Sequence, residues 1–370
     1  MAQIQSVSGD GLVVCVCGER EYKARDVIDA ALFRGELEKS WKEFLCRIAA
    51  EQRARELGLE LDYVAVEDMA EAFRYTHDLI TAEETEQWLS DRGLTLEEFT
   101  DYFARQYWQT ELREKISPVR AGRAVDVDLS SAPDALRHLF ITDLIFSDEL
   151  DRLTQQLTWR LAALAENGRA QTDSKEITRE REEFLERHKI KPPKIADWLG
   201  QIDRDEEWLE EILAMEAAYR KSRETVLNSH AQKKQLAMLR VPLTQFEAEV
   251  IEVESRDAAK EALMCIQEDG MSMEQVATEA RYPFRCITFH QQDIPDDLQQ
   301  KFWAVRPGDF LDPVPRGDGF ELYRVVKRAE ADLNDATVRE RIDDRLLERH
   351  FSALARDHVE LRLAASVSME

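Results

Sequence analysis

A repeated pattern in the first two thirds of the chain constrains the fold more than any other sequence feature. Residues 14–37 and 125–150 both open with alternating valines and both end on an aromatic-x-x-Glu-Leu pattern. The matches continue downstream in the same order, and the offset between matched positions drifts by only a few residues. Because the matched motifs occur in the same order in both stretches, they indicate an internal duplication. The further matched pairs are 71–77 with 182–188, 88–89 with 198–199, and 94–99 with 202–208.

The first copy predicts a definite order of helices. An extended segment leads into a long helix at 37–57, and apolar residues at helical spacing then predict a second helix around Phe73. A short helix follows, and a last long helix runs over about 96–116. Thr81 and Thr95 each begin a Thr-x-x-Glu capping box, which marks the start of a helix.

We therefore expect two related helical modules, at 1–118 and 119–240. Trp88 and Trp198 occupy matched positions, so burial between helices is a better interpretation for them than a peptide-binding stripe. Aromatic side chains exposed for binding would instead occupy positions that differ between the copies. Such positions are Tyr102, Trp108 and Trp159.

The excess of acidic over basic residues limits the kinds of partner that the chain can bind. Its 370 residues include 50 Lys and Arg against 75 Asp and Glu, a formal net charge of −25. Phosphate backbones and anionic lipid are repelled by such a surface. The most basic stretch, 187–194, carries two prolines and is typical of a solvated loop. No stretch approaches the roughly 20 apolar residues of a membrane-spanning helix. We expect neither nucleic acid nor membrane insertion.

The cysteines indicate neither disulfides nor a metal centre. Cys15 and Cys17 share one face of a predicted strand, but no nearby His or Cys completes a four-ligand set. We expect no cofactor and no metal. Reduced cysteines, with no basic and apolar leader at residues 1–6, predict a cytoplasmic location. The other cysteines are Cys46, Cys265 and Cys286.

From about Leu243 the pattern changes to a β-α-α-β-α-β order, which is typical of a small α+β domain. We place this domain at 241–330 and a separate C-terminal helix at 331–370. That helix carries an apolar stripe opposite charged residues, so it needs a partner, and we expect it to pack back on the helical part. The stripe is Val338, Ile342, Leu346, Leu347 and Phe351.

Three segments of the small domain carry a family resemblance. In 294–309 an apolar helix leads into Ala-Val-Arg-Pro-Gly-Asp, and Asp-Pro-Val at 312–314 and Gly-Asp-Gly-Phe-Glu-Leu at 317–322 follow. In this order they resemble the parvulin (PpiC-type) peptidyl-prolyl isomerases, and the helical modules resemble the N-terminal region of SurA-like chaperones. The resemblance implies a mostly helical α+β fold with two helical modules, a parvulin-like α+β domain and a C-terminal helix that packs back on the helical part.

The chain departs from the family at the catalytic positions. Parvulins carry histidines on the first and last strands of the domain, and the matched positions here are Glu249 or Val250, depending on register, and Glu321. A carboxylate in an apolar pocket is costly unless it is protonated or paired. The resemblance therefore implies a degenerate, cytosolic member with weak or absent isomerase activity. The residues matched to its peptide-binding shelf, with neighbouring aromatics, are Ile294, Leu298, Phe302, Trp303 and Phe289.

The leading functional hypothesis is a chaperone-like protein that binds unfolded or extended polypeptide, precursor peptides of a maturation or secretion system among its clients. Two alternatives stay open. One is an active parvulin-type isomerase, favoured by the surviving apolar shelf and opposed by the missing histidines. The other is a non-catalytic adaptor for one fixed partner. The seven histidines are scattered, and His290 is the one nearest the expected pocket. No Gly-rich phosphate loop, GxSxG or HExxH motif occurs.

Overall fold

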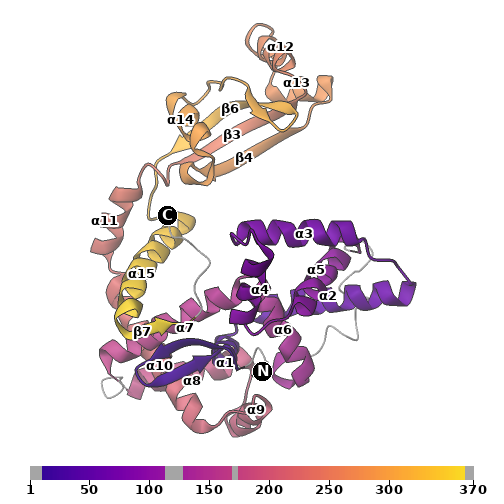
Figure 1. The fold of residues 1–370 in the computed structure, drawn as a ribbon. Coiled ribbons are helices and arrows are strands. Elements are labelled where there is room, and N and C mark those ends of the chain that lie inside the picture. The colour runs from indigo at the N-terminus through magenta and orange to yellow at the C-terminus, as the bar shows by residue number, and fades with distance from the viewer. Residues whose placement is uncertain (1–10, 113–127, 169–173, 363–370) are drawn as a thin grey trace. The chain divides into compact units, whose positions relative to one another are not determined.

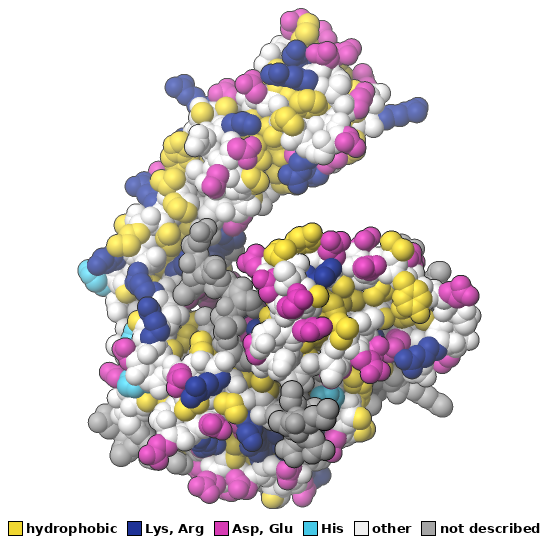
Figure 2. Space-filling view, viewed as in Figure 1, with side chains coloured by type: hydrophobic (Ala, Val, Ile, Leu, Met, Phe, Trp, Pro, Cys, Tyr) yellow, Lys and Arg dark blue, Asp and Glu magenta, His cyan; other side chains and the backbone are white. Residues whose placement is uncertain are grey.

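The computed structural model describes residues 11–112, 128–168 and 174–362 (Figure 1). They divide into two compact units. Unit 1 comprises the chain up to Arg223 together with the residues from His350 onward, and unit 2 comprises Glu224–Arg349. Charged side chains are spread over the face shown in Figure 2, as the charged content of 34% leads one to expect. Within the described ranges, no helix is both long enough and apolar enough to cross a membrane.

Unit 1 is built mainly from helices, with one small antiparallel sheet in the order β2-β1-β7. In the first half the elements are β1 (Val13–Cys17), β2 (Arg20–Lys23), α1 (Ala24–Arg34), α2 (Glu38–Leu57), α3 (Tyr63–Thr76), α4 (Ala82–Asp91) and α5 (Leu96–Glu111). In the second they are η2 (Leu129–Ser131), α6 (Asp134–Phe146), α7 (Glu149–Asn167), α8 (Ser174–His188), η4 (Pro192–Lys194), α9 (Ile195–Gln201) and α10 (Glu206–Val226), with β7 (Val359–Leu361) near the C-terminus.

Local sequence signals set the helix boundaries. Thr81 caps α4 and Thr95 caps α5, and both predicted capping boxes are confirmed. In each box the threonine hydroxyl accepts a hydrogen bond from the backbone N–H of a glutamate, whose carboxylate accepts one from the threonine N–H. The alternating valines expected at 125–127 lie outside the described residues.

The five helices α1–α5 are followed in the same order by α6–α10. Residues with a left-handed backbone conformation, that is with positive φ, recur at matched helix ends. Such a conformation commonly ends a helix. Trp88 and Trp198 are both buried, and each meets a phenylalanine, Phe73 and Phe184 respectively, edge to face. These correspondences support our proposal of a duplication. The left-handed pairs are Gly35 and Asp148, Asp78 and Lys189, and Gly93 and Asp203.

The aromatic residues expected to be exposed are buried. Tyr102, Trp108 and Trp159 all have less than a tenth of their surface accessible. Tyr102 lies against Phe146, and Trp159 stacks on Phe351. Positions that differ between the two halves therefore serve packing here, and that expectation was wrong.

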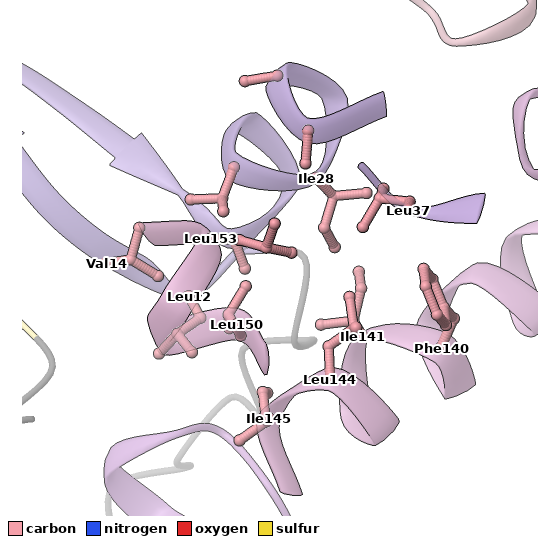
Figure 3. Close-up of a cluster of buried hydrophobic side chains, with 14 of the residues drawn as sticks. Leu12, Val14, Ile28, Leu37, Phe140, Ile141, Leu144, Ile145, Leu150 and Leu153 are labelled. Carbon is pink, nitrogen blue, oxygen red and sulfur yellow. The ribbon is translucent and has the colours of Figure 1, made fainter. Parts of the chain in front are cut away.

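The two halves of unit 1 exchange helices. Phe33 of α1 stacks on Phe184 of α8, with ring centroids 4.6 Å apart, and Phe146 of α6 stacks on Trp88 of α4. Each phenylalanine thus enters the aromatic cluster of the other half. Figure 3 shows how α1, α6 and α7 contribute side chains to one shared apolar core. Neither half encloses its own core.

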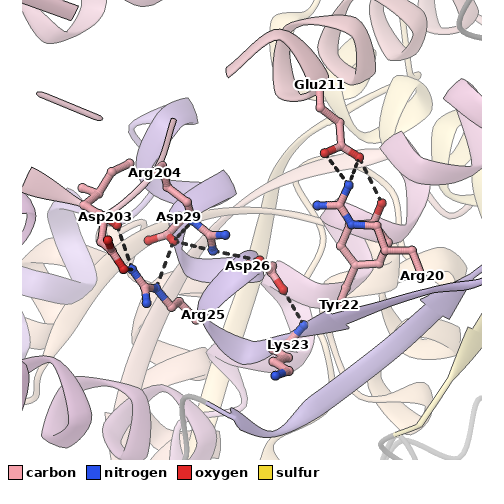
Figure 4. Close-up of polar contacts among 10 residues, drawn as sticks. Arg20, Tyr22, Lys23, Arg25, Asp26, Asp29, Asp203, Arg204 and Glu211 are labelled. Atoms are coloured by element: carbon pink, nitrogen blue, oxygen red, sulfur yellow. Dashed lines mark hydrogen bonds and ion pairs between the residues drawn. The ribbon is translucent and has the colours of Figure 1, made fainter. Parts of the chain in front are cut away.

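Polar contacts fix the same exchange (Figure 4). Arg204, just before α10, donates to Asp26 at 2.8 Å and to Asp29 at 2.7 Å, and both carboxylates belong to α1. Arg25 of α1 donates in turn to Asp203 at 3.2 Å. Burial raises the pKa of Asp29, and the charge and hydrogen bond of Arg204 oppose that rise. The loop before α10 is therefore tied to α1 by charge as well as by packing.

Unit 2 contains a four-stranded antiparallel sheet in the order β4-β3-β6-β5. One face packs against α14 through Phe246 and Val250, and the other packs against α12 and α13 through Ile251 and Val253. The expected β-α-α-β-α-β order is present, with one further short strand, β5, between α14 and the last strand. The elements are α11 (Ser229–Leu239), β3 (Gln245–Val253), α12 (Arg256–Gln267), α13 (Met273–Ala280), β4 (Phe284–His290), η5 (Gln291–Asp293), α14 (Asp296–Ala304), β5 (Val314–Arg316) and β6 (Gly319–Ala329).

The C-terminal helix α15 (Ala336–His358) contributes to both units. In unit 2, Ile342 packs beside Leu243, and Gln232 of α11 donates to Asp343 at 2.7 Å. In unit 1, Phe351 is fully buried against Trp159 of α7. The expected packing of this helix on the helical part is confirmed, and so is the mostly helical α+β fold class.

Candidate functional site

The sheet of unit 2 borders an open cavity of about 760 Å³. The cavity lies where β3 ends and where β4 and β6 begin. Gly319 opens β6 next to the carbonyl oxygen of Val253, and a Cβ at that position would lie only 2.6 Å from the oxygen. The walls combine apolar and charged side chains from Glu252, Val253, Glu254, Ala280, Arg281, Tyr282, Pro283, Arg285, Arg316, Phe320 and Glu321.

Glu321 is the most enclosed carboxylate of this cavity, with 2% of its surface exposed. The hydroxyl of Tyr323 donates to its Oε2, and Arg285 donates to its Oε1 at 2.5 Å. The Nε of Arg316 lies 3.8 Å away. Arg285 also pairs with Glu252 on the neighbouring strand. Both carboxylate oxygens of Glu321 therefore have hydrogen-bond donors, which is what a buried carboxylate requires.

Electrostatics keep Tyr323 protonated. Burial raises its pKa above the ordinary value for tyrosine, and the hydrogen bond and charge of Glu321 raise it further. The phenol thus acts as a donor to Glu321 rather than as a free hydroxyl that faces the cavity.

The two carboxylates matched to the family histidines do not come together. In the strand register, Glu249 lies opposite Arg324 and Glu252 lies opposite Glu321. Because neighbouring side chains of a strand point to opposite faces, Glu249 and Glu321 lie on different faces of the sheet. Glu249 forms an ion pair with Arg324 at 3.4 Å. In the alternative register Val250 shares the face of Glu321, and it is fully buried.

The residues beside Glu321 were missed from sequence alone. Glu252 and Arg285 join it only because β3 pairs with β4 and with β6 in one particular register. That register depends on side chains far apart in the chain. One signal was present, because Arg285 directly precedes the predicted strand at 286–289.

The five predicted shelf residues lie on the α14 face of the sheet, and none of them lines the cavity. Leu298 and Phe302 belong to the core of unit 2, with 5% and 1% of their surface exposed. Ile294 and Phe289 are half-buried against this core, and Phe289 meets Phe302 edge to face at 5.0 Å. Trp303 is 43% exposed, and the guanidinium of Arg328 lies over its ring.

His290 lies at the end of β4 and away from the cavity. It is buried, its Nδ1 lies 3.4 Å from Asp293, and its Nε2 has no hydrogen-bond partner among the residues that the structure describes. Asp293 is held by Arg341 at 2.7 Å. In the part of the chain that the structure describes, no group of His, Cys, Asp and Glu is arranged to hold a metal ion.

No family model and no curated protein matches this chain. Among solved structures, it is similar to the peptidylprolyl isomerase PrsA from Bacillus cereus at 14% identity, over 58% of this chain and 85% of that chain, with a TM-score of 0.32. It is similar to the foldase PrsA from Streptococcus pneumoniae at 18% identity, over 60% and 85%, with a TM-score of 0.26. A SurA-like chaperone of Campylobacter jejuni matches at 12% identity, over 59% and 89%, with a TM-score of 0.19. Values this low leave the function to be argued from the site.

Proposed function

We propose that this chain is a chaperone-like protein that binds unfolded or extended polypeptide, and that unit 2 holds a client segment in the cavity beside Glu321. The observation that carries the proposal is this cavity, with partly exposed apolar walls and a carboxylate whose hydrogen bonds are complete. The apolar part of the walls, which includes Tyr282, Pro283 and Phe320, favours binding at roughly 25 cal/mol for each Å² of apolar surface removed from water. Pockets of some 300–1,000 Å³ are typical of ligand sites.

The edge of the sheet offers a way to hold an extended chain. In the order β4-β3-β6-β5, strand β4 has a neighbouring strand on one side. An extended peptide can add to such an edge through backbone hydrogen bonds. Tyr282 and Pro283 line the cavity immediately before β4 begins at Phe284. A peptide strand paired with β4 would therefore lead into the cavity.

The hydrogen bonding of Glu321 favours binding over catalysis. An isomerase accelerates its reaction by stabilising the twisted amide more than the planar one, which requires polar groups aimed at the reacting bond. Here the hydroxyl of Tyr323 is engaged by Glu321, and Arg285 is engaged by Glu321 and Glu252. The proposal therefore includes weak or absent isomerase activity, in a degenerate parvulin-like domain.

We also propose where the protein acts and which polypeptides it binds. The five cysteines are free, which fits a reducing compartment, so we propose that the protein acts in the cytoplasm. Precursor peptides awaiting modification or export are clients of suitable chemistry, because they are extended and unfolded. Of the predicted shelf, we propose the exposed Trp303 and the half-buried Ile294 and Phe289 as further peptide contacts.

The test is a fluorescence titration of a labelled, extended, proline-containing peptide with the full chain, beside an isomerisation assay on the same peptide. Tyr282→Ser should weaken binding by about tenfold, or roughly 1.4 kcal/mol. Met238→Ser, which changes an exposed side chain of α11, should leave binding unchanged. If the chain bound no peptide at all, the alternative of a non-catalytic adaptor for one fixed partner would be favoured. Turnover comparable to that of an active parvulin, abolished by Glu321→Gln, would make the chain an isomerase.

A further inference from the structure

The exposed apolar side chains of the described residues are concentrated on one part of unit 1. Thirteen large hydrophobic side chains are exposed within the described ranges, and six of them fall between Leu57 and Ile80. Tyr63 and Val64 are the most exposed, at 74% and 69%. Figure 2 shows hydrophobic and acidic side chains next to one another over α3. We call this region the α3 surface; its apolar members are Leu57, Leu59, Tyr63, Val64, Tyr75 and Ile80.

The α3 surface is not a core face left uncovered by a loosely placed helix. The opposite side of α3 packs into the core of unit 1, where Val66 is buried and Phe73 meets four aromatic rings edge to face. Asp62 caps the helix by accepting hydrogen bonds from the backbone N–H groups of Val64 and Ala65. The first turn is therefore fixed, and it holds Tyr63 and Val64 toward solvent.

Acidic residues surround these apolar side chains. Between Glu56 and Glu84 the chain has nine carboxylates and one arginine, Arg74. On α3, the carboxylates at 67, 68 and 71 form no ion pair with any described side chain. Val64, Asp68, Glu71 and Tyr75 recur at i, i+4, i+7 and i+11, which places them along one stripe of the helix.

We infer that the α3 surface binds a cationic, apolar segment of polypeptide, in which Lys or Arg alternates with large apolar side chains. Such a segment can bury Tyr63 and Val64 while its charges meet the unpaired carboxylates. A second copy of this chain would bring the same acidic surface against itself about a two-fold axis, and like charges oppose that contact. Nucleic acid and anionic lipid are repelled for the same reason.

This inference goes beyond the proposed function, because the α3 surface belongs to unit 1 and the cavity belongs to unit 2.

The apolar side chains and the carboxylates of the α3 surface have different effects on binding. Apolar burial supplies affinity, whereas exposed carboxylates steer the encounter and make it sensitive to salt. A client with both features would therefore bind the α3 surface fastest at low ionic strength.

The test uses the full chain and a labelled synthetic peptide of repeated Leu-Lys pairs, followed by fluorescence anisotropy. Tyr63→Ser with Val64→Ser, and separately Glu67→Lys with Glu71→Lys, should each weaken binding by about tenfold. All four side chains are exposed, so a thermal melt should show an unchanged fold. Met238→Ser with Val241→Ser is the matched control, because it removes exposed apolar groups from unit 2 and should leave affinity unchanged.

Four results would overturn the inference. The first is a Leu-Glu peptide that binds as tightly as the Leu-Lys peptide, and the second is an affinity that does not change with salt concentration. The third is an affinity of the α3 variants equal to that of the control variant. The fourth is a dimer in analytical sedimentation that the α3 substitutions convert to a monomer. Tyr282→Ser should not change affinity for the Leu-Lys peptide. If Tyr282→Ser weakened binding of the Leu-Lys peptide, this peptide would bind in the cavity of unit 2 and not at the α3 surface. If Tyr282→Ser weakened only the binding of the proline-containing peptide, the inference about the α3 surface would stand.

Discussion

At the scale of single residues, the contacts of Glu321 allow a direct test of its structural role. Glu321→Leu leaves the Tyr323 hydroxyl without its acceptor, and we expect a loss of about 1–3 kcal/mol in the free energy of unfolding. Glu321→Gln keeps an acceptor at the same place and should cost less. Urea denaturation measures both. Equal stability of the wild type and the leucine variant would contradict a structural role for this cluster.

Glu183 provides a prediction about pH. The hydrogen bond and charge of Arg220, with a contribution from Arg179, lower the pKa of Glu183 to about 2, against an ordinary value of 4.5. Since the folded pKa lies below the unfolded one, the stabilisation is present above pH 4.5 and is lost as the pH falls toward 2.

We therefore expect Glu183→Gln to flatten the acid limb of the melting temperature plotted against pH. The side chain is 36% exposed, so the contribution at neutral pH should stay below about 1 kcal/mol. Glu182→Gln, at an exposed neighbour without an ion pair to a described side chain, is the control. Parallel acid limbs for both variants and the wild type would show that the Arg220 contact does not stabilise the fold.

The sequence predicted what is local to these residues and missed what depends on pairing. A carboxylate at 321 in need of a partner could be predicted from its apolar surroundings. Its partners Arg285 and Tyr323 could not, because they come from register and from the alternation of side chains across a strand. The same alternation separates Glu249 from Glu321, although both were matched to catalytic positions.

At the scale of secondary-structure elements, the exchange of α1 and α6 predicts that the two halves of unit 1 unfold together. Phe33 and Phe146 are almost wholly buried, and each lies in the aromatic cluster of the other half. Phe33→Ala and Phe146→Ala should each cost about 3–5 kcal/mol. Thermal unfolding followed by tryptophan fluorescence should show both variants shifting one and the same transition. Separate transitions for the two halves would contradict a shared core.

Helix positions and caps were predictable, whereas helix partners were not. Thr81 and Thr95 determine helix starts through hydrogen bonds to residues three positions away, so the sequence pattern is sufficient there. The apolar spacing around Phe33 and Phe146 indicates that each is buried. It carries no information about which helix covers the face. Tyr102 and Trp159 illustrate the same limit, since a position that differs between the halves can still be buried by an unmatched neighbour.

At the scale of the whole molecule, the helix α15 matters to both units. Its apolar stripe required a partner on sequence grounds alone, since the small domain already closes its own sheet. The structure divides that stripe between two cores. Ile342 belongs to a cluster with Leu243 in unit 2, and Phe351 belongs to unit 1. Periodicity could not have shown this division, because both stretches have the same spacing.

Removal of residues 335–370 should therefore lower the melting temperatures of both units. Unit 1 would lose β7 from its sheet and Phe351, which meets Tyr219 at 4.7 Å; unit 2 would lose Ile342. Two substitutions in the full chain separate these effects. Phe351→Ala should destabilise unit 1 by about 3–5 kcal/mol and Ile342→Ala should destabilise unit 2 by about 2–5 kcal/mol. Hydrogen exchange resolved by peptide assigns each loss to its unit. If truncation left protection in 11–112 unchanged, α15 would be dispensable to the helical part, and its packing there would not explain why the apolar stripe continues as far as Phe351.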